Sequence, residues 1–424
     1  MKETLSEKVR YQVSHLWGRL KIFAKWMMIS GAMGLGVGLI SCLFYYCMQY
    51  VVDYRKGHPG ILFGLPLAGL AIVFMYEKAG RGNDRGTNTV LAAIRTEDEI
   101  PVSVAPLIFV STVITHLFGG SSGREGAALQ LGGSIGSWFG RLLHMDRKDI
   151  NIIIMCGMSA AFSALFGTPM AAAIFSMEVV SVGIMYYAAL VPCVFSALIA
   201  QGVAKFLQIA PERFTILEVP QMALLPAVKI IALAALCGGI SVVFCILLHT
   251  AAKKGREWFP NPYLRIIAAS IMIIVPTLLI GSRDYLGAGM EVIERSIEGD
   301  VKPEAFVMKM LFTAVTLGAG FKGGEIVPSF FVGATFGCLA GQLLGISPSL
   351  CAAVGMVAVF CGVTNSPITS LLIAFELFGF EGAQYFLLAV AVSYMLSGYY
   401  GLYQSQKIVY SKYKTEYLDR LTRK

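Results

Sequence analysis

Charged residues are scarce in this 424-residue chain, at 14%, while 56% of its residues are hydrophobic and its mean hydropathy is +0.69. Residues 26–52 and 326–375 contain no charged side chain, and residues 152–204 contain only Glu178. Apolar stretches of about 18 residues or more are typical of transmembrane helices. This pattern excludes an ordinary soluble domain, and we expect an all-α, polytopic integral membrane protein that sits in a lipid bilayer.

The sequence also lacks the cysteine and histidine spacings that build disulfide frameworks or metal sites. Its nine cysteines include no Cys-x-x-Cys pair, and its five histidines are not paired at ligand spacing. A nucleophile with a matching base is not evident either. We therefore expect no metal, no cofactor and no enzymatic activity.

Positive charge is concentrated at the two ends of the chain. Residues 1–26 contain six Lys or Arg and two acidic residues, and residues 404–424 contain the same numbers. The positive-inside rule then places both ends in the cytoplasm, on either side of a multi-pass membrane domain at 27–403. The first apolar stretch has no clear cleavage site, so we interpret it as a retained helix in the cell membrane. Because the charge rims the membrane, a nucleic-acid partner is not expected.

The chain repeats itself, which predicts two halves at about 27–210 and 225–403. The pattern Gly-Met-x-Ala-x-Phe occurs at 157–162 and again at 355–360. Three more positions recur at the same spacing: Thr168 with Ser366, Pro169 with Pro367, and Glu178 with Glu376. The hydroxyls precede prolines that suit a first helical position, so we expect them to cap broken helices. The two glutamates are expected to be structural and to pair with backbone amides or a cation in a loop.

Glu125 is the most informative single residue, because it is a lone carboxylate between two uncharged stretches. A charge at membrane depth costs roughly 2.5–3.5 kcal/mol on insertion scales and indicates a functional residue. The glycines on either side of it allow backbone N–H groups to point at an anion. The N–H groups at the start of a helix can bind an anion in the same way. A carboxylate there can carry charge in one state and a proton in another, which indicates a proton-linked anion pathway.

Two glycine motifs resemble those of the CLC family of chloride channels and proton-coupled anion antiporters. Residues 123–127 (GREGA) are similar to the family's GREGP motif, and residues 324–328 (GEIVP) are similar to its GxFxP motif. Residues 362–376 resemble its second-half segment that ends in a glutamate. The resemblance covers about residues 26–403. It implies two inverted-topology repeats of tilted and broken helices, and a homodimer with an anion pathway in each subunit.

The resemblance also implies roles for individual residues. Glu125 corresponds to the gating glutamate, which competes with the anion and moves protons, and Tyr403 corresponds to a tyrosine whose hydroxyl faces the anion. The remaining expected anion-binding positions lie in the two glycine loops: Gly123, Arg124, Gly126, Gly324, Ile326 and Val327.

The chain departs from the family where the GSGIP motif is expected, because residues 81–87 replace it. The anion-coordinating serine falls on Asn83 if Gly82 is the matching glycine, and on Thr87 if Gly86 is. An amide offers two N–H donors and a hydroxyl offers one, so the choice affects selectivity. Both alternatives are open at the level of sequence.

Two further departures bear on the substrate. Glu325 places a carboxylate in the anion loop, and its protonated form would donate a hydrogen bond, which fluoride accepts more strongly than other halides. Val179 stands where proton-coupled chloride members have a second glutamate. Lys322 is a candidate ion-pair partner of Glu325, and such a pair would weaken the proton-donor role.

Together these departures resemble the fluoride/proton antiporter branch of the family. We therefore expect fluoride to leave the cytoplasm while a proton enters, with Glu125 and Glu325 handling protons. The alternative is a chloride channel or a chloride/proton exchanger. Val179 and a hydroxyl at Thr87 favour a passive chloride channel or an uncoupled chloride carrier.

Overall fold

The computed structural model describes the backbone of residues 5–82, 84–96 and 98–422, and the side chains of this part from Ser14 onward. The described chain is mainly helical, with sixteen α-helices, two short 3-10 helices and three short strands. In the first half the helices are α1 (Leu5–Gly57), η1 (Pro59–Gly64), α2 (Leu65–Lys78), α3 (Thr87–Thr96), α4 (Val104–Leu117), α5 (Glu125–Leu142), α6 (Arg147–Phe166), α7 (Pro169–Glu178), η2 (Tyr187–Ala189) and α8 (Leu190–Phe206). In the second half they are α9 (Leu224–Trp258), α10 (Pro262–Ile280), α11 (Met290–Ile297), α12 (Ala305–Ala319), α13 (Ile326–Leu344), α14 (Pro348–Thr364), α15 (Pro367–Phe378) and α16 (Ala383–Leu396). The strands are β1 (Ser181–Val182), β2 (Lys407–Tyr410) and β3 (Tyr417–Leu421).

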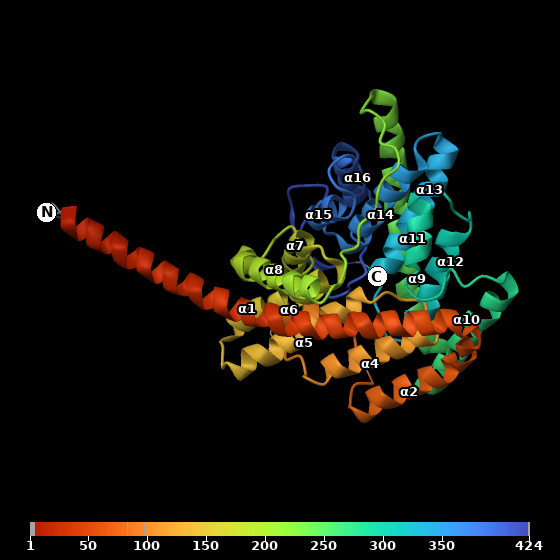
Figure 1. Cartoon of the computed structure of the whole chain (residues 1–424), viewed down its shortest axis with the longest axis horizontal. Coiled ribbons are helices and arrows are strands. Elements are labelled where there is room, and N and C mark those ends of the chain that lie inside the picture. Colours follow the sequence, from red (N-terminus) through yellow and green to blue (C-terminus); the bar gives the residue numbers. More distant parts are fainter. Residues whose placement is uncertain (1–4, 83, 97, 423–424) are drawn as a thin grey trace.

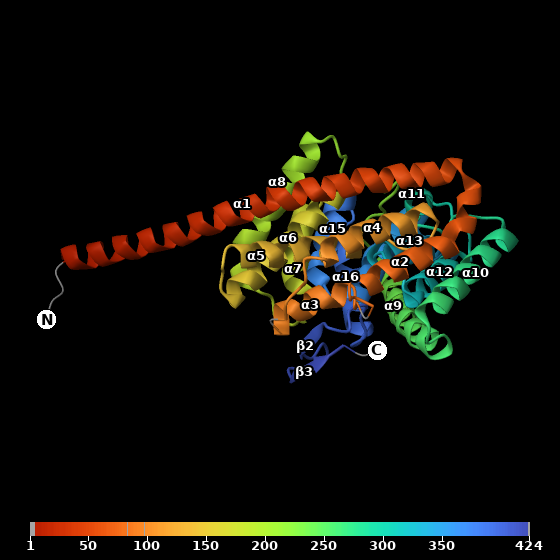
Figure 2. The same cartoon turned by 90° about the horizontal axis from the view of Figure 1, so that it is seen from below.

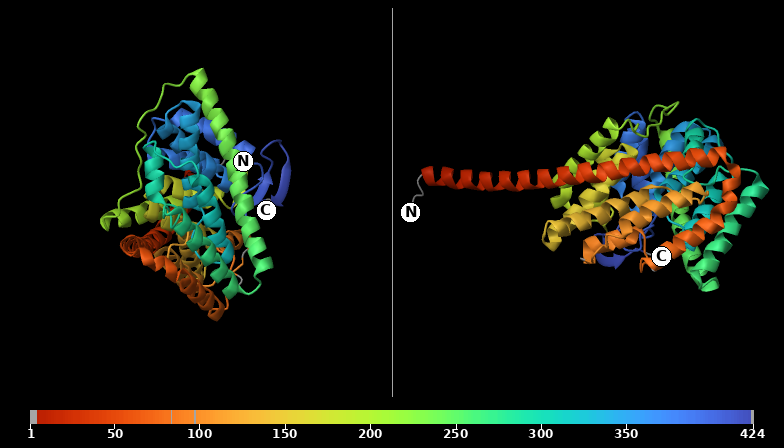
Figure 3. Two further views of the ribbon diagram at one scale, coloured as in Figure 1. Left: turned by 90° about the vertical axis from the view of Figure 1, so that its right-hand side faces the viewer. Right: turned by 60° about the horizontal axis from the view of Figure 1, so that its bottom comes forward.

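Seven helical segments among the described residues are long and apolar enough to cross a membrane. The two halves lie side by side, with α1 to α8 forming one part of the body and α9 to α16 the other (Figure 1). Helix α1 extends well beyond the body at its N-terminal end, while α9 runs along one side of it (Figure 3). The predicted class, a polytopic helical membrane protein, is confirmed.

Within each half, two neighbouring helices pack closely through glycine, and the two helix pairs occupy corresponding places in the two halves. A Cβ atom on Gly132 of α5 would lie 2.1 Å from the carbonyl oxygen of Gly157 in α6. The same atom on Gly333 of α13 would lie 2.3 Å from the carbonyl oxygen of Gly355 in α14. No side chain fits at such a crossing, so the glycines permit backbone contact between the helices.

Each half contains a helix that stops and restarts. The residues directly after α6 and α14, Gly167 and Asn365, are in the left-handed conformation with φ of 71° and 57°. Helices α7 and α15 begin two residues later with a proline. The expected caps from Thr168 and Ser366 are wrong, because neither hydroxyl caps its helix.

The caps instead come from the other half of the molecule. Glu376, at the end of α15, accepts hydrogen bonds from the amides of Met170 and Ala171 at 2.9 Å each. Glu178, at the end of α7, accepts from the amides of Ile368 and Thr369 at 3.1 and 2.8 Å. The two half-helices therefore cap each other reciprocally. This confirms the structural role expected for both glutamates and relates the two halves by a local pseudo-two-fold arrangement.

Residues 404–422 are more than the short basic tail expected from the sequence. Strand β2 pairs in parallel with β1 of the first half and antiparallel with β3, which forms a small sheet beside the helices (Figure 2). The Lys412 ammonium donates to the side-chain oxygen of Asn365 at 2.5 Å and to the carbonyl of Tyr394 at 3.0 Å. This hairpin is thus fastened to the ends of α14 and α16.

Candidate anion and proton site

The two glycine motifs meet at the centre of the molecule. The amide of Gly123 donates to the carbonyl of Gly324 at 2.6 Å, and the amide of Gly324 donates back to Gly123 at 2.7 Å. Helices α5 and α13 begin directly after this antiparallel bridge. Because helix starts carry partial positive charge and unpaired N–H groups, the bridge places two anion-attracting ends together.

The bridge requires glycine on both sides. A Cβ atom on Gly324 would lie 2.4 Å from the amide nitrogen of Gly126, and one on Gly126 would lie 2.9 Å from the Cα of Gly324. Real Cβ atoms do not approach backbone this closely. The two loops therefore touch through their main chains.

The bridge also changes which amides can face an anion. The amides of Gly123 and Gly324 each donate to the carbonyl oxygen of the other residue, so in this structure neither is free to donate to an anion as the sequence predicted. The helix starts next to them still have amides without an intrahelical partner. Of the predicted set these are the amides of Gly126, Ile326 and Val327.

The Glu125 carboxylate lies against this same loop and is 1% exposed. Its Oε2 accepts from the amide of Arg124 at 2.9 Å and lies 2.4 Å from the position of a Cβ on Gly123. The carboxylate thus takes a backbone amide at the start of α5, as a bound anion would. Its carboxylate therefore lies at a helix start, where negative charge is favoured.

Arg124 is held by carboxylates. Its guanidinium lies 3.0 Å from Glu212 and 3.5 Å from the Glu125 carboxylate, and it also lies over the ring of Tyr45. Glu212, which the sequence analysis did not single out, lies in the loop after α8. The Arg124 side chain therefore neutralises acidic groups in this structure, and its predicted contact with an anion stays a prediction.

Glu325, the residue before α13, brings a second carboxylate close to the first loop. One of its oxygens lies 3.3 Å from the position of a Cβ on Gly126, the residue after Glu125. The pairing predicted between Glu325 and Lys322 is wrong. Lys322 instead lies 2.8 Å from Asp84 and 4.0 Å from the centre of the Tyr76 ring.

The reason is the direction of the loop: the Lys322 side chain turns toward α2 and the segment before α3. Asp84 has 5% side-chain exposure, so this ion pair is largely shielded from solvent. Within the described part of the chain, no lysine or arginine forms an ion pair with Glu325. Glu325 can therefore exchange a proton without first losing a cationic partner.

Tyr403 lies between α16 and β2, at the C-terminal end of the second half. Its side chain is fully buried, and its hydroxyl has no hydrogen-bond partner among the described residues. Its carbonyl accepts from the hydroxyl of Thr422 at 2.8 Å. The C-terminal hairpin thus braces the tyrosine from behind while its hydroxyl stays available.

Thr87 also belongs to this group. It is 4% exposed at the start of α3, and its hydroxyl lies 3.4 Å from the carbonyl oxygen of Gly126. The other candidate for the serine position, Asn83, lies outside the described residues. The structure therefore places Thr87 at the loop, and the role of Asn83 stays a prediction.

Gln130 is a neighbour that the sequence analysis missed. It lies on α5, is 2% exposed, and its amide nitrogen is 3.3 Å from the hydroxyl oxygen of Thr87. A buried amide one turn after Glu125, in a stretch without charge, is a sequence signal that could have identified it.

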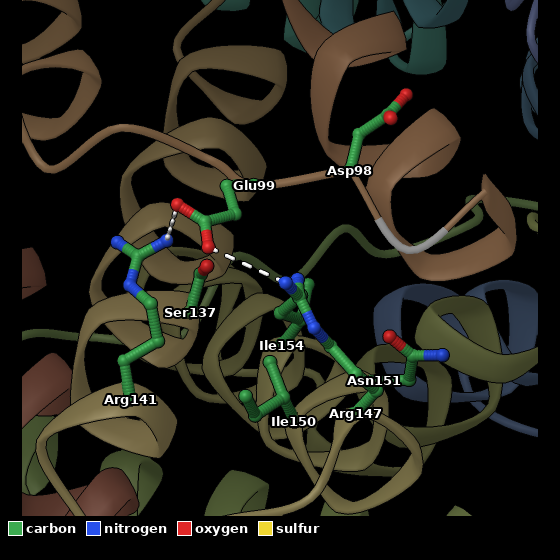
Figure 4. Close-up of a pocket in the computed structure, with 8 residues that line it drawn as sticks. All are labelled: Asp98, Glu99, Ser137, Arg141, Arg147, Ile150, Asn151 and Ile154. Carbon is green, nitrogen blue, oxygen red and sulfur yellow. Dashed lines mark hydrogen bonds and ion pairs between the residues drawn. The ribbon is translucent and has the colours of Figure 1, made fainter. Parts of the chain in front are cut away.

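A surface pocket at the end of α5 is separate from this site (Figure 4). There Glu99 lies between Arg141 and Arg147, at 3.8 and 3.4 Å. None of the residues predicted for the anion site lines this pocket. The charges of Glu99, Arg141 and Arg147 there are paired with one another.

The geometry defines a class of protein: a membrane protein in which two helix starts and two carboxylates lie together between duplicated halves, and a buried phenol keeps its hydroxyl unpartnered among the described residues. Such an arrangement can hold an anion and exchange a proton for it.

Comparison with known proteins gives the family. The model of the voltage-gated chloride channel family matches residues 64–398, so the chain belongs to this CLC family. A chloride/fluoride channel protein of Pseudomonas syringae pv. tomato is 34% identical over 401 residues, which cover 93% of this chain and 89% of the relative.

Solved structures agree on the fold. The crystal structure of a CLC-type fluoride/proton antiporter matches with a TM-score of 0.88 at 29% identity and covers 91% of this chain and 98% of that one. A slow cyanobacterial Cl⁻/H⁺ antiporter matches with a TM-score of 0.74 at 17% identity, over 88% of this chain and 94% of that one. The predicted family is confirmed.

Proposed function

We propose that this protein exchanges fluoride for protons across the cell membrane, with fluoride leaving the cytoplasm as a proton enters. The observation that carries the proposal is the pair of carboxylates, Glu125 and Glu325, at the two helix starts joined by the glycine bridge. Two negative charges would repel an anion from a place that the helix ends make attractive. Binding of the anion is therefore tied to protonation of these groups.

Glu125 supplies the blocking step. Its carboxylate takes the amide of Arg124 and lies over the loop where an anion would bind. A proton removes the charge, weakens this charge-assisted hydrogen bond and lets the side chain leave. The anion can then bind the unpaired amides of the helix starts, and the proton travels with Glu125.

Glu325 and Tyr403 supply donors suited to fluoride. A protonated Glu325 presents an O–H group, and the Tyr403 hydroxyl has no partner among the described residues. Fluoride is the smallest halide and the strongest hydrogen-bond acceptor among them. A site whose donors are hydroxyl groups therefore favours fluoride over larger halides. The relatives named for fluoride support the same substrate.

A second candidate is a chloride channel or a chloride/proton exchanger. The channel is favoured by Val179, which is fully buried where the second glutamate of proton-coupled chloride members would stand. Its neighbour Glu178 does not replace that glutamate, because both of its oxygens are used to cap α15. In the fluoride proposal Glu325 takes over the proton step.

We further propose that both chain ends face the cytoplasm and that the protein works as a homodimer without enzymatic activity. The basic residues at 1–26 and 404–424 support this orientation. The dimer rests on membership of the family.

The proposal is tested by transport in proteoliposomes loaded with fluoride or chloride. A fluoride or chloride electrode follows efflux, and an external pH electrode follows proton uptake while an ionophore clamps the voltage. We expect fluoride efflux to exceed chloride efflux and to be accompanied by proton uptake. Glu125→Gln cannot exchange a proton, so it should abolish proton uptake.

Glu77→Gln is the matched control, because Glu77 is an exposed carboxylate that accepts a hydrogen bond from Tyr263 at 2.6 Å, outside the site. This variant should transport like the wild type. Full proton coupling in Glu125→Gln would refute the mechanism. Rapid chloride efflux without proton movement in the wild type would favour the second candidate.

A further inference from the structure

Gln130 makes contacts that fix the orientation of its side-chain amide. The Nε2 atom lies 3.2 Å from the carbonyl oxygen of Gly126 and 3.3 Å from the hydroxyl oxygen of Thr87. Only the nitrogen can donate to a carbonyl, so the opposite amide orientation would set two acceptors against each other. Gln130 therefore donates one N–H to each of the two groups.

This arrangement determines what the Thr87 hydroxyl can do. Its oxygen accepts from Gln130, so its proton must point elsewhere. Among the described residues, the one acceptor for that proton is the carbonyl of Gly126, at 3.4 Å, which also accepts from Gln130. Hydroxyl hydrogen bonds are ordinarily about 2.7–2.8 Å long, so this contact is weak. The Thr87 proton can thus turn to a better acceptor at little cost.

The other end of the amide indicates that a ligand space is close. The Oε1 atom of Gln130 is buried and has no hydrogen-bond partner among the described residues. Buried acceptors are almost always paired in proteins, if necessary by water. An acceptor without a protein donor, beside the two loops of the anion site, fits a place that is hydrated while the ion passes.

We propose that Gln130 is a positioning residue that sets halide selectivity by directing the Thr87 hydroxyl proton toward the transported anion. The inference rests on the proposed function, because it requires the anion to pass the loop at Gly126. Without Gln130, the Thr87 proton turns to the carbonyl of Gly126, which is then free to accept it. A hydroxyl donor discriminates most strongly for the halide that accepts best, so fluoride gains most from the orientation.

The test is a double-mutant cycle on Gln130 and Thr87, read as the ratio of fluoride to chloride efflux from proteoliposomes. Gln130→Met keeps the length of the side chain and removes both donors. We expect it to lower the ratio by about tenfold, the effect of one hydrogen bond to a charged group. Thr87→Val should lower the ratio to a similar extent. The double variant should be no worse than Thr87→Val alone, because Gln130 acts through that hydroxyl.

Gln201→Met is the matched control, since Gln201 also donates to a backbone carbonyl, that of Gly167 at 3.1 Å, at the end of α6. It should leave the ratio unchanged. Selectivity of the wild-type kind in Gln130→Met, or additive losses in the double variant, would overturn the proposal. If the methionine variant does not fold, Gln130→Glu is the second test. A glutamate side chain has at most one donor, so it cannot donate to both Gly126 and Thr87, and the fluoride-to-chloride ratio should still fall. An unchanged ratio refutes the inference.

The design separates this inference from the proposed function. Proton uptake by the wild type tests fluoride/proton exchange, whereas the ratio in the Gln130 variants tests orientation of the hydroxyl. A wild type that transports halides without protons would refute only the exchange.

Discussion

Substitution of Glu178 and Glu376, which cap each other's half-helices, should destabilise the protein to unequal extents. Glu178 accepts three hydrogen bonds, from the amides of Ile368 and Thr369 and from the Thr369 hydroxyl at 2.6 Å, and it is 8% exposed. Glu376 accepts two, from Met170 and Ala171, and is only half-buried. The two glutamates therefore offer an internal comparison of buried and partly hydrated caps.

The magnitude follows from the groups left without partners. Glu178→Ala leaves the backbone amides of Ile368 and Thr369 without their carboxylate acceptor. Counting these two amide bonds alone, at about 1.5–3 kcal/mol for each bond to a charged group, we expect a loss of ~3–6 kcal/mol in unfolding free energy. At Glu376 water can replace the carboxylate, so Glu376→Ala should cost ~1–3 kcal/mol. Glu178→Gln retains one carbonyl acceptor and should fall between wild type and Glu178→Ala.

The assay is the fraction of detergent-solubilised protein that stays monodisperse after heating, measured by size-exclusion chromatography. The order of stability should be wild type, then Glu376→Ala, then Glu178→Ala. The same proteins, reconstituted below their unfolding temperatures, should keep the wild-type ratio of protons to fluoride. A stable Glu178→Ala variant that loses proton coupling would refute the capping role and would make Glu178 a proton carrier.

Two further predictions concern the backbone of the site. Gly324→Ala should abolish fluoride efflux, because its Cβ would lie 2.4 Å from the amide nitrogen of Gly126. The control is Gly239→Ala on α9, whose Cβ would have no neighbour atom among the described residues within 4 Å apart from its own stretch of helix, and it should transport normally. An active Gly324→Ala variant would show that the bridge is dispensable. Thr422→Val removes the hydrogen bond from the Thr422 hydroxyl to the Tyr403 carbonyl. It should raise the apparent KM for fluoride and lower the free energy of unfolding by ~0.5–1.5 kcal/mol. An unchanged KM in initial-rate efflux would show that the hairpin does not affect the site.

Several parts of the fold could be predicted because their signals are local. Long uncharged stretches identified the membrane helices, and glycine motifs with prolines marked the places where helices stop and restart. The recurrence at 198 residues identified the two halves. Each of these properties depends on residues within one or two turns of a helix, or on comparison of the chain with itself.

The errors concern partners that are distant in the sequence. Thr168 was expected to cap its own helix, yet Glu376 supplies that cap from 206 residues away. Lys322 was expected to pair with Glu325, three residues along, yet it pairs with Asp84 at a separation of 238 residues. Proximity along the chain was a poor guide in both cases, because a loop can point its side chain to either side.

The sequence by itself determined the class of this protein, its duplication and the identity of the two carboxylates at the helix starts. Hydropathy, glycine and proline act locally, and a buried acid is conspicuous wherever it stands. Only the tertiary structure decided three contacts: the amides that donate within the Gly123–Gly324 bridge, the pairing of Lys322 with Asp84 and not with Glu325, and the hydrogen bond from Gln130 to Thr87. Those outcomes depend on how two duplicated halves face each other, because hydrogen bonds and ion pairs form over about 3 Å and require that exact placement.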